Sequence, residues 1–258
     1  MGVVPDLDRG RRFLAAHPPP GRVLLLAVTG SHNYGFSSPD SDLDLKGIHV
    51  APTERLLGLG RPAEAHDRLE VFDGQECDLT TNEVGRAMSL MLKGNGNMLE
   101  RIFSPFQLVD TPEIPAMRVL AQGSLSQACF GHYAGYFQGM QREHTRATPR
   151  AKSLLYTYRV ALTGVHLLRT GEVEAHLPTL AERYGLAEVE ELIAIKAEGA
   201  EKQALTPAED ERFRAAWPRL EQMLRDAKEG SPLPERPQNR DAVERWLIDL
   251  RRHELLGA

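Results

Sequence analysis

Two aspartates in the run Asp42-Leu43-Asp44-Leu45 are the residues of this chain whose type and spacing best fit a chemical role. They open a segment of alternating apolar residues that ends at Val50, and this pattern predicts a strand. Side chains two positions apart on a strand face the same way, with Cα atoms roughly 6–7 Å apart. Two carboxylates at this separation can hold Mg²⁺ together with waters and substrate phosphates.

A Gly30-Ser31 pair precedes the aspartates by ten intervening residues and follows the apolar run 23–28, which predicts a buried strand. A strand that ends in Gly-Ser and turns into a helix start leaves backbone N–H groups and a hydroxyl pointing outward, which suits a phosphate. Taken singly, Gly-Ser is common in turns and Asp-x-Asp can be a solvated strand face. Their order on two adjacent predicted strands favours a metal–nucleotide site.

The same motifs carry a family resemblance. Gly30-Ser31 followed by Asp42-Leu43-Asp44 resembles the signature of the polymerase-beta-type nucleotidyltransferase superfamily. The fuller stretches 30–35, 39–44 and 47–50 are similar to a narrower branch, the predicted nucleotidyltransferases associated with RNA ligase and RNA repair. The resemblance is strongest between residues 23 and 105 and continues at 95–100, Ser104-Pro105, Lys152, Tyr158-Arg159, Thr170-Gly171-Glu172, Ala194-Ile195-Lys196 and Leu233-Pro234.

The resemblance implies a third catalytic acid on a neighbouring strand, and it places this acid at Asp78. Residues 69–80 predict a β-hairpin around an Asp-Gly turn. Cys77 and Leu79 alternate around Asp78, so Asp78 projects from the opposite face, which Glu76 and Thr80 share as rivals. Asp42, Asp44 and Asp78 are expected to bind two Mg²⁺ ions, which Mn²⁺ can replace, and an NTP, with ATP favoured.

Further nucleotide-binding residues are expected beside Gly30 and Ser31. Lys93, Lys152 and Arg159 are candidate clamps for a triphosphate, and Tyr156 is a candidate for stacking on the base. Lys152 and Arg159 are seven residues apart, which is two helical turns, so they share one helix face. The alternatives are a solvated helix face and a core tyrosine. His32 is a weaker candidate for a catalytic acid.

The predicted elements change character near Pro105. Before it, a helix at 6–17 and strands at 22–28, 42–50 and 69–80 precede a helix that Thr81 or Asn82 can cap. After it, only helices are predicted, near 113–122, 124–141, 149–170, 187–199, 207–228 and 240–254. We therefore expect an α+β protein, with a mixed-sheet nucleotidyltransferase domain over 1–108 and an all-helical domain over 109–258 that completes the cleft.

Composition bounds the partners and the compartment. The net charge of −5 argues against a broad nucleic-acid surface, although the stretch from Arg142 to Arg169 contains six basic residues and one acid, Glu143. The two cysteines have no metal-binding spacing. No secretory signal and no membrane-length apolar stretch are evident, so we expect a cytoplasmic protein without a membrane partner.

Three functions remain open at this level. The first is transfer of a nucleotide to an RNA end, as in tRNA-like RNA repair or processing. The second is nucleotidylation of a protein or a small molecule, which the same three acids would serve. The third is a non-catalytic nucleotide sensor or partner protein, and the presence of all three carboxylates counts against it. The acceptor, the nucleotide and the oligomeric state stay open.

Overall fold

The computed structural model describes residues 3–198 and 204–256, which divide into two compact units. Among the described residues, the sheet unit comprises 5–30, 42–125 and 236–256, and the helical unit comprises 3–4, 31–41, 126–198 and 204–235. Each unit is assembled from separate stretches of the chain. The predicted domain boundary between residues 108 and 109 stays a prediction, and residue 199, the last of the predicted helix 187–199, lies outside the described residues.

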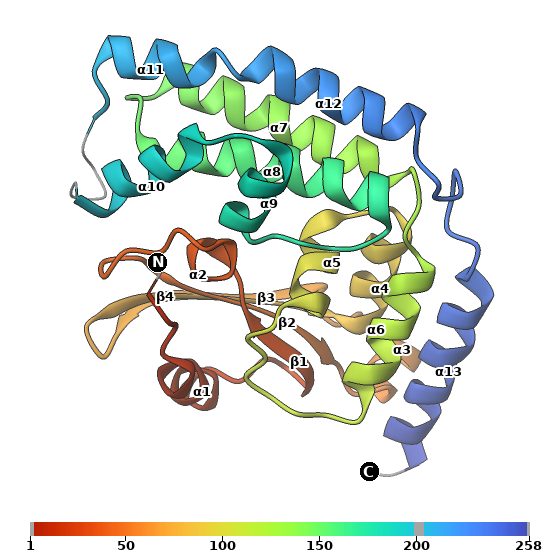
Figure 1. The fold of residues 1–258 in the computed structure, drawn as a ribbon. Helices are drawn as coiled ribbons and strands as arrows, with labels where there is room; N and C mark the ends of the chain where they lie inside the picture. The colour runs from red at the N-terminus through yellow and green to blue at the C-terminus, as the bar shows by residue number, and fades with distance from the viewer. Residues whose placement is uncertain (1–2, 199–203, 257–258) are drawn as a thin grey trace. The chain divides into compact units, whose positions relative to one another are not determined.

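The sheet unit is built on a four-stranded mixed sheet with strand order β1-β2-β4-β3 (Figure 1). The strands are β1 (Arg22–Val28), β2 (Leu43–Val50), β3 (Ala65–Phe72) and β4 (Gln75–Glu83). β1 pairs with β2 and β3 pairs with β4 in antiparallel fashion, whereas β2 and β4 run parallel. The predicted α+β class with a mixed sheet is confirmed.

A two-residue turn joins β3 to β4 and fixes their register. Asp73 has φ 50° and Gly74 has φ 82°, and an Asp-Gly pair is the sequence that adopts such a turn most readily. The burial of β4 alternates: Cys77 and Leu79 are buried, whereas Asp78 lies half-exposed between them. β4 therefore presents one apolar and one polar face.

The apolar face packs against α1 (Leu7–Ala16). Phe13 is fully buried there and meets the ring of Phe72 edge-on at 5.3 Å between centroids. The buried cluster consists of Phe13, Leu26, Val28, Leu43, Leu45, Cys77, Leu79 and Leu108. Because side chains alternate along a strand, burial of Leu43 and Leu45 directs Asp44 and Lys46 to the other face.

Short helices complete the sheet unit: α3 (Glu54–Leu57), α4 (Val84–Leu92), α5 (Gly96–Phe103), α6 (Glu113–Gly123) and α13 (Arg240–Leu256). The prediction that Thr81 or Asn82 caps α4 is wrong. Glu83 is the N-cap, and its carboxylate accepts a 2.8 Å hydrogen bond from the Gly85 N–H. Thr81 remains in β4, where its hydroxyl contacts His49 Nδ1 at 2.9 Å.

The helical unit surrounds α8 (Ala151–Thr170), which is buried along most of its length. α7 (Cys129–Arg146), α9 (Leu177–Tyr184), α10 (Glu188–Glu198) and α12 (Trp217–Glu229) all contact it, and α11 (Pro207–Arg214) precedes α12. No strand forms among the described residues beyond 108, which confirms the helix-only pattern. None of the described helices is long and apolar enough to span a membrane.

Three helix predictions need correction. The sequence patterns predict no helix between 149–170 and 187–199, but α9 forms there. Pro178 occupies its first turn, where the missing N–H costs nothing. The single helix predicted at 207–228 is two helices, α11 and α12, and Pro218 again lies in a first turn. The helix predicted at 124–141 begins at Cys129 and ends at Arg146.

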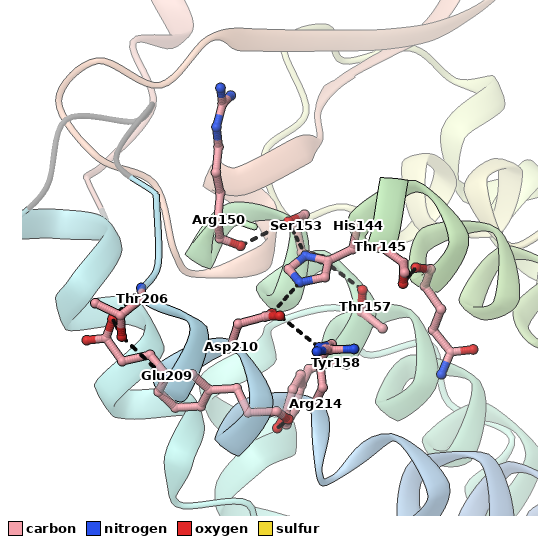
Figure 2. A network of polar contacts seen from close by, with 12 residues as sticks. His144, Thr145, Arg150, Ser153, Thr157, Tyr158, Thr206, Glu209, Asp210 and Arg214 are labelled. Atoms are coloured by element: carbon pink, nitrogen blue, oxygen red, sulfur yellow. Dashed lines mark hydrogen bonds and ion pairs between the residues drawn. The ribbon is translucent and has the colours of Figure 1, made fainter. Parts of the chain in front are cut away.

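A buried polar network ties α7, α8 and α11 together (Figure 2). His144 Nδ1 lies 2.6 Å from Ser153 Oγ, and its Nε2 lies 2.7 Å from Asp210 Oδ1. The other carboxylate oxygen of Asp210 pairs with Arg214 Nε at 2.9 Å. His144 is only 1% exposed, and this Ser-His-Asp chain holds the three helices together.

Candidate active site

Asp44 and Asp78 are direct partners in the parallel pairing of β2 and β4. Partner residues on neighbouring strands project to the same face, and the strands are about 4.8 Å apart. Both side chains are half-exposed, whereas their neighbours Leu43, Leu45, Cys77 and Leu79 are fully buried. The sheet thus sets two carboxylates side by side on the face that α1 does not cover.

Asp42 immediately precedes β2, one residue before the strand begins. The alternation of burial runs back to it, because Ser41 and Leu43 are buried and Asp42 is half-exposed. The burial pattern therefore indicates that Asp42 lies on the same face of the strand as Asp44. Of the two rivals to Asp78, Glu76 is exposed, and Thr80 is engaged by a lysine, as described below.

The backbone at Gly30 packs directly against the Asp44 carboxylate. Gly30 has φ +62°, and a Cβ atom added there would lie 1.7 Å from Asp44 Oδ2. The preceding Thr29 donates its N–H to the Asp44 carbonyl at 2.9 Å. Only glycine can therefore occupy this position without moving the carboxylate, and the first residue of the Gly-Ser motif is built around an acid of the site.

A lysine that the sequence analysis did not single out completes this face. Lys46 Nζ donates to Asp78 Oδ2 at 2.7 Å and to Thr80 Oγ1 at 3.2 Å. Lys46 pairs with Thr80 across β2 and β4, one step along from the Asp44–Asp78 pair. The signal was present in the sequence, since Lys46 follows Asp44 at the two-residue period of a strand.

The donors on this face suit a hard cation. All the candidate ligands are carboxylate oxygens, which Mg²⁺ prefers, and Mg²⁺ is commonly held by one or two carboxylates together with substrate phosphates. Among the described residues, no group of three His, Cys, Asp or Glu side chains is arranged to hold a metal unaided. Carboxylate oxygens fit a magnesium ion, and the ligand roles of Asp42, Asp44 and Asp78 stay predictions.

The helical unit contains Ser31 in α2 (Gly30–Tyr34) and the α8 candidates. The Arg159 guanidinium lies 4.0 Å from the centroid of the Tyr34 ring. Tyr156 meets the Tyr34 and Phe36 rings edge-on at 5.8 and 5.3 Å. Arg159 is 1% exposed, so it does not lie on a solvated helix face; a desolvated cation–π contact of this kind contributes about 2 kcal/mol.

The other candidates differ in their exposure. Lys152 is half-buried near the start of α8, and Lys93 is the exposed C-cap residue of α4. Their contacts with a nucleotide, like those of Ser31, Tyr156 and Arg159, stay predictions. Burial lowers the pKa of His32 below its ordinary value, and its Nδ1–H donates to the Val3 carbonyl at 3.1 Å, so a neutral ring does not favour the acid role.

Lys196 is a second buried cation that local sequence patterns did not single out. Its ammonium is 2.7 Å from Ser38 Oγ and 3.2 Å from Ser41 Oγ, and all three residues are at most 5% exposed. Ser41 is followed directly along the chain by Asp42. Lys196 thus anchors the loop that leads into the first aspartate. Only the family resemblance, which includes Ala194-Ile195-Lys196, pointed to this residue.

A turn at Gly30 beside the paired strand residues Asp44 and Asp78, on a mixed sheet, matches the arrangement expected for the polymerase-beta-type nucleotidyltransferases that the sequence resembles. A profile of the RNA repair pathway DNA polymerase beta family matches residues 9–249, and this chain belongs to that family. The resemblance found in the sequence is thereby confirmed.

Two further comparisons found weaker similarities. An uncharacterized protein of Methanocaldococcus jannaschii is 24% identical over 155 residues, which are 59% of this chain and 63% of that protein. The chain thus matches less than two thirds of the length of this curated relative. A crystal structure of a nucleotidyltransferase-like protein from Exiguobacterium sibiricum aligns over 96% of this chain and 80% of its own, at 12% identity and a TM-score of 0.33.

Proposed function

We propose that this protein is a metal-dependent nucleotidyltransferase that moves NMP from an NTP, preferably ATP, to the hydroxyl of an RNA end. The observation that carries the proposal is the in-register pairing of Asp44 and Asp78, with Gly30 closed against the Asp44 carboxylate. Paired carboxylates beside an N–H-rich turn are what phosphoryl transfer requires, because its catalysis consists of positioning and charge stabilisation.

Each proposed site residue has its own role in the transfer. Asp42, Asp44 and Asp78 would hold two Mg²⁺ ions, whose charge lowers the pKa of an attacking hydroxyl and neutralises the leaving pyrophosphate. Gly30 fixes the Asp44 carboxylate, and the Gly30-Ser31 turn offers N–H groups and a hydroxyl to the phosphates. Lys93, Lys152, Tyr156 and Arg159 are proposed contacts of the nucleotide, with Arg159 acting from a buried position.

The choice of RNA as the acceptor rests on the family, whose description names an RNA repair pathway. The basic stretch of α7 and α8 gives modest physical support, and burial of Arg159 removes one cation from its surface. With a net charge of −5, the protein is expected to neutralise few phosphates. We therefore expect a shallow dependence of RNA binding on salt, with a log–log slope of only about −1 to −4.

Transfer of label decides the function. The protein is incubated with each α-³²P-labelled NTP and Mg²⁺ or Mn²⁺, with pooled tRNA, with added protein, or without an acceptor. Label in RNA that depends on the divalent cation and disappears in Asp44→Asn supports the proposal. Label in protein or in a small hydroxyl compound, but never in RNA at low salt, refutes the RNA acceptor and leaves nucleotidyl transfer standing.

The sensor alternative predicts a different outcome. It requires that calorimetry detect NTP binding while no acceptor takes up label under any condition. The wild type would then show no transfer activity that Asp44→Asn could abolish, and the assignment of this protein as an enzyme would be overturned.

A further inference from the structure

The third carboxylate of the site already has a cationic partner. Lys46 Nζ lies 2.7 Å from Asp78 Oδ2, and the side chains are 21% and 38% exposed. This distance is that of a charge-assisted hydrogen bond. The ammonium of Lys46 therefore lies in the place that a divalent cation bound to Asp78 Oδ2 would take.

The register of the sheet explains the placement of this lysine. Asp44 and Asp78 are partners on β2 and β4, and Lys46 and Thr80 are the pair two residues further along. Two carboxylates side by side repel each other, and a cation at the next step of the same face offsets that repulsion. Lys46 also donates to Thr80 Oγ1 at 3.2 Å, so it has a second anchor that does not belong to the acids.

We propose that Lys46 is a positioning residue for Asp78: it holds the carboxylate beside Asp44 before the metal arrives, and it gives up this carboxylate to the incoming divalent cation. The exchange breaks one N⁺–H···O⁻ hydrogen bond and forms one oxygen–metal contact. Lys46 stays at the site through Thr80. This inference rests on the proposed function, because it requires Asp78 to be a metal ligand.

The proposal makes Lys46 a competitor of the metal, so removing its charge should tighten metal binding. Mn²⁺ alone is titrated into the full chain, and free Mn²⁺ is followed by electron paramagnetic resonance. Lys46→Met is expected to bind Mn²⁺ about two- to fivefold more tightly than the wild type, which is the range expected for loss of a partly exposed ion pair. Lys46→Arg, which keeps the charge, should restore the wild-type affinity.

Two controls separate this exchange from a general effect of charge. Arg68→Met removes one positive charge from the same sheet, but Arg68 pairs with Leu79 and so projects to the other face. It should leave the Mn²⁺ affinity within about 1.5-fold of the wild type. In an Asp78→Asn background, Lys46→Met should add no tightening, because the contested oxygen has lost its charge.

The outcomes separate the role of Lys46 from the role of Asp78 as a metal ligand. Weaker Mn²⁺ binding in Asp78→Asn with unchanged binding in Lys46→Met overturns the role of Lys46 alone. Unchanged binding in Asp78→Asn overturns both the ligand role of Asp78 and this inference. Tightening by Lys46→Met that Arg68→Met matches also overturns it. If Lys46→Met fails to fold by circular dichroism, Lys46→Gln is measured with the same expectations.

Discussion

One hydrogen-bonded polar pair in each unit has the same length but lies in the opposite environment. In the sheet unit, Lys46 and Asp78 are 21% and 38% exposed. In the helical unit, His144 and Asp210 are 1% and 9% exposed and share a network with Ser153 and Arg214. The comparison teaches that similar partners at the same 2.7 Å separation can serve exchange in one place and permanent structure in another.

Solvation is the physical basis of that difference. A partly exposed ion pair is worth about 0.2–1 kcal/mol, so either partner can leave it at little cost. Removing one partner of a buried pair leaves an uncompensated charge and costs about 3–5 kcal/mol. The Lys46–Asp78 pair can therefore release a charge to a ligand, whereas the His144–Asp210 contact is fixed. Four variants test this contrast.

The largest effect is expected for Asp44→Asn. Charge stabilisation by a bound metal is worth several kcal/mol, so loss of this ligand should lower nucleotidyl transfer by about 10³-fold. The melting temperature should change by no more than about 2 °C, since a half-exposed site side chain contributes little to stability. Asp73→Asn, which removes an acid from the nearby hairpin turn, should keep full activity. Equal activity in the two variants would break the comparison.

On the structural side, Asp210→Ala should destabilise the fold by about 2 kcal/mol, because the buried His144 ring loses a hydrogen-bond partner and Arg214 loses its carboxylate. Urea titration of the free energy of unfolding measures this loss. The matched control is Asp249→Ala, whose partner Arg252 is 72% exposed and which should change stability by about 0.5 kcal/mol at most. A small effect at Asp210 would show that the network is not structural.

Gly30→Ala and Gly74→Ala separate the cost of backbone strain from the effect of displacing the Asp44 carboxylate. Both Gly30 and Gly74 have positive φ, of +62° and +82°, so alanine costs about 1 kcal/mol at either. Only at Gly30 would the new methyl group strike the Asp44 carboxylate; at Gly74 nothing lies within 4 Å. Transfer should fall about 100-fold in Gly30→Ala and persist in Gly74→Ala, since displacing a catalytic group by 1 Å costs that much.

The smallest effect concerns pH. Burial lowers the pKa of His49, a fully buried residue of β2, below its ordinary value. The unfolded chain then binds more protons than the folded chain below about pH 6.5, so the stability present above that pH is lost as the pH falls through the folded pKa. Urea titrations at pH 7.5 and 5.5 should show a smaller loss in His49→Gln than in the wild type. The exposed His253→Gln should behave like the wild type.

Local patterns predicted much of the sheet unit. The apolar run before Gly30, the alternation after Asp42 and the Asp73-Gly74 turn correspond to β1, β2 and the β3–β4 hairpin. These signals lie within a few residues of one another, where periodicity and turn chemistry act. The fold class and the family were predicted, the structure confirms the first, and the family profile confirms the second.

Long-range features could not be predicted in this way. The register that pairs Asp44 with Asp78 joins residues 34 positions apart, and no local pattern encodes it. The burial of Arg159 depends on Tyr34, which comes from a distant segment, so a basic helix face could not be told from a buried cation. Lys46 escaped notice because a lysine on a strand face is ordinary until its partner across the sheet is known.

The last helix gives the sheet unit an order of assembly. α13 packs on α4, where Arg251 pairs with Glu83 and donates to the Ala51 carbonyl at 3.0 Å. During synthesis, the predicted acids Asp42, Asp44 and Asp78 therefore leave the ribosome long before Arg251. Arg251 then contacts Glu83 at the start of α4. We expect β2 and β4 of a nascent chain to stay incompletely packed until synthesis reaches this segment.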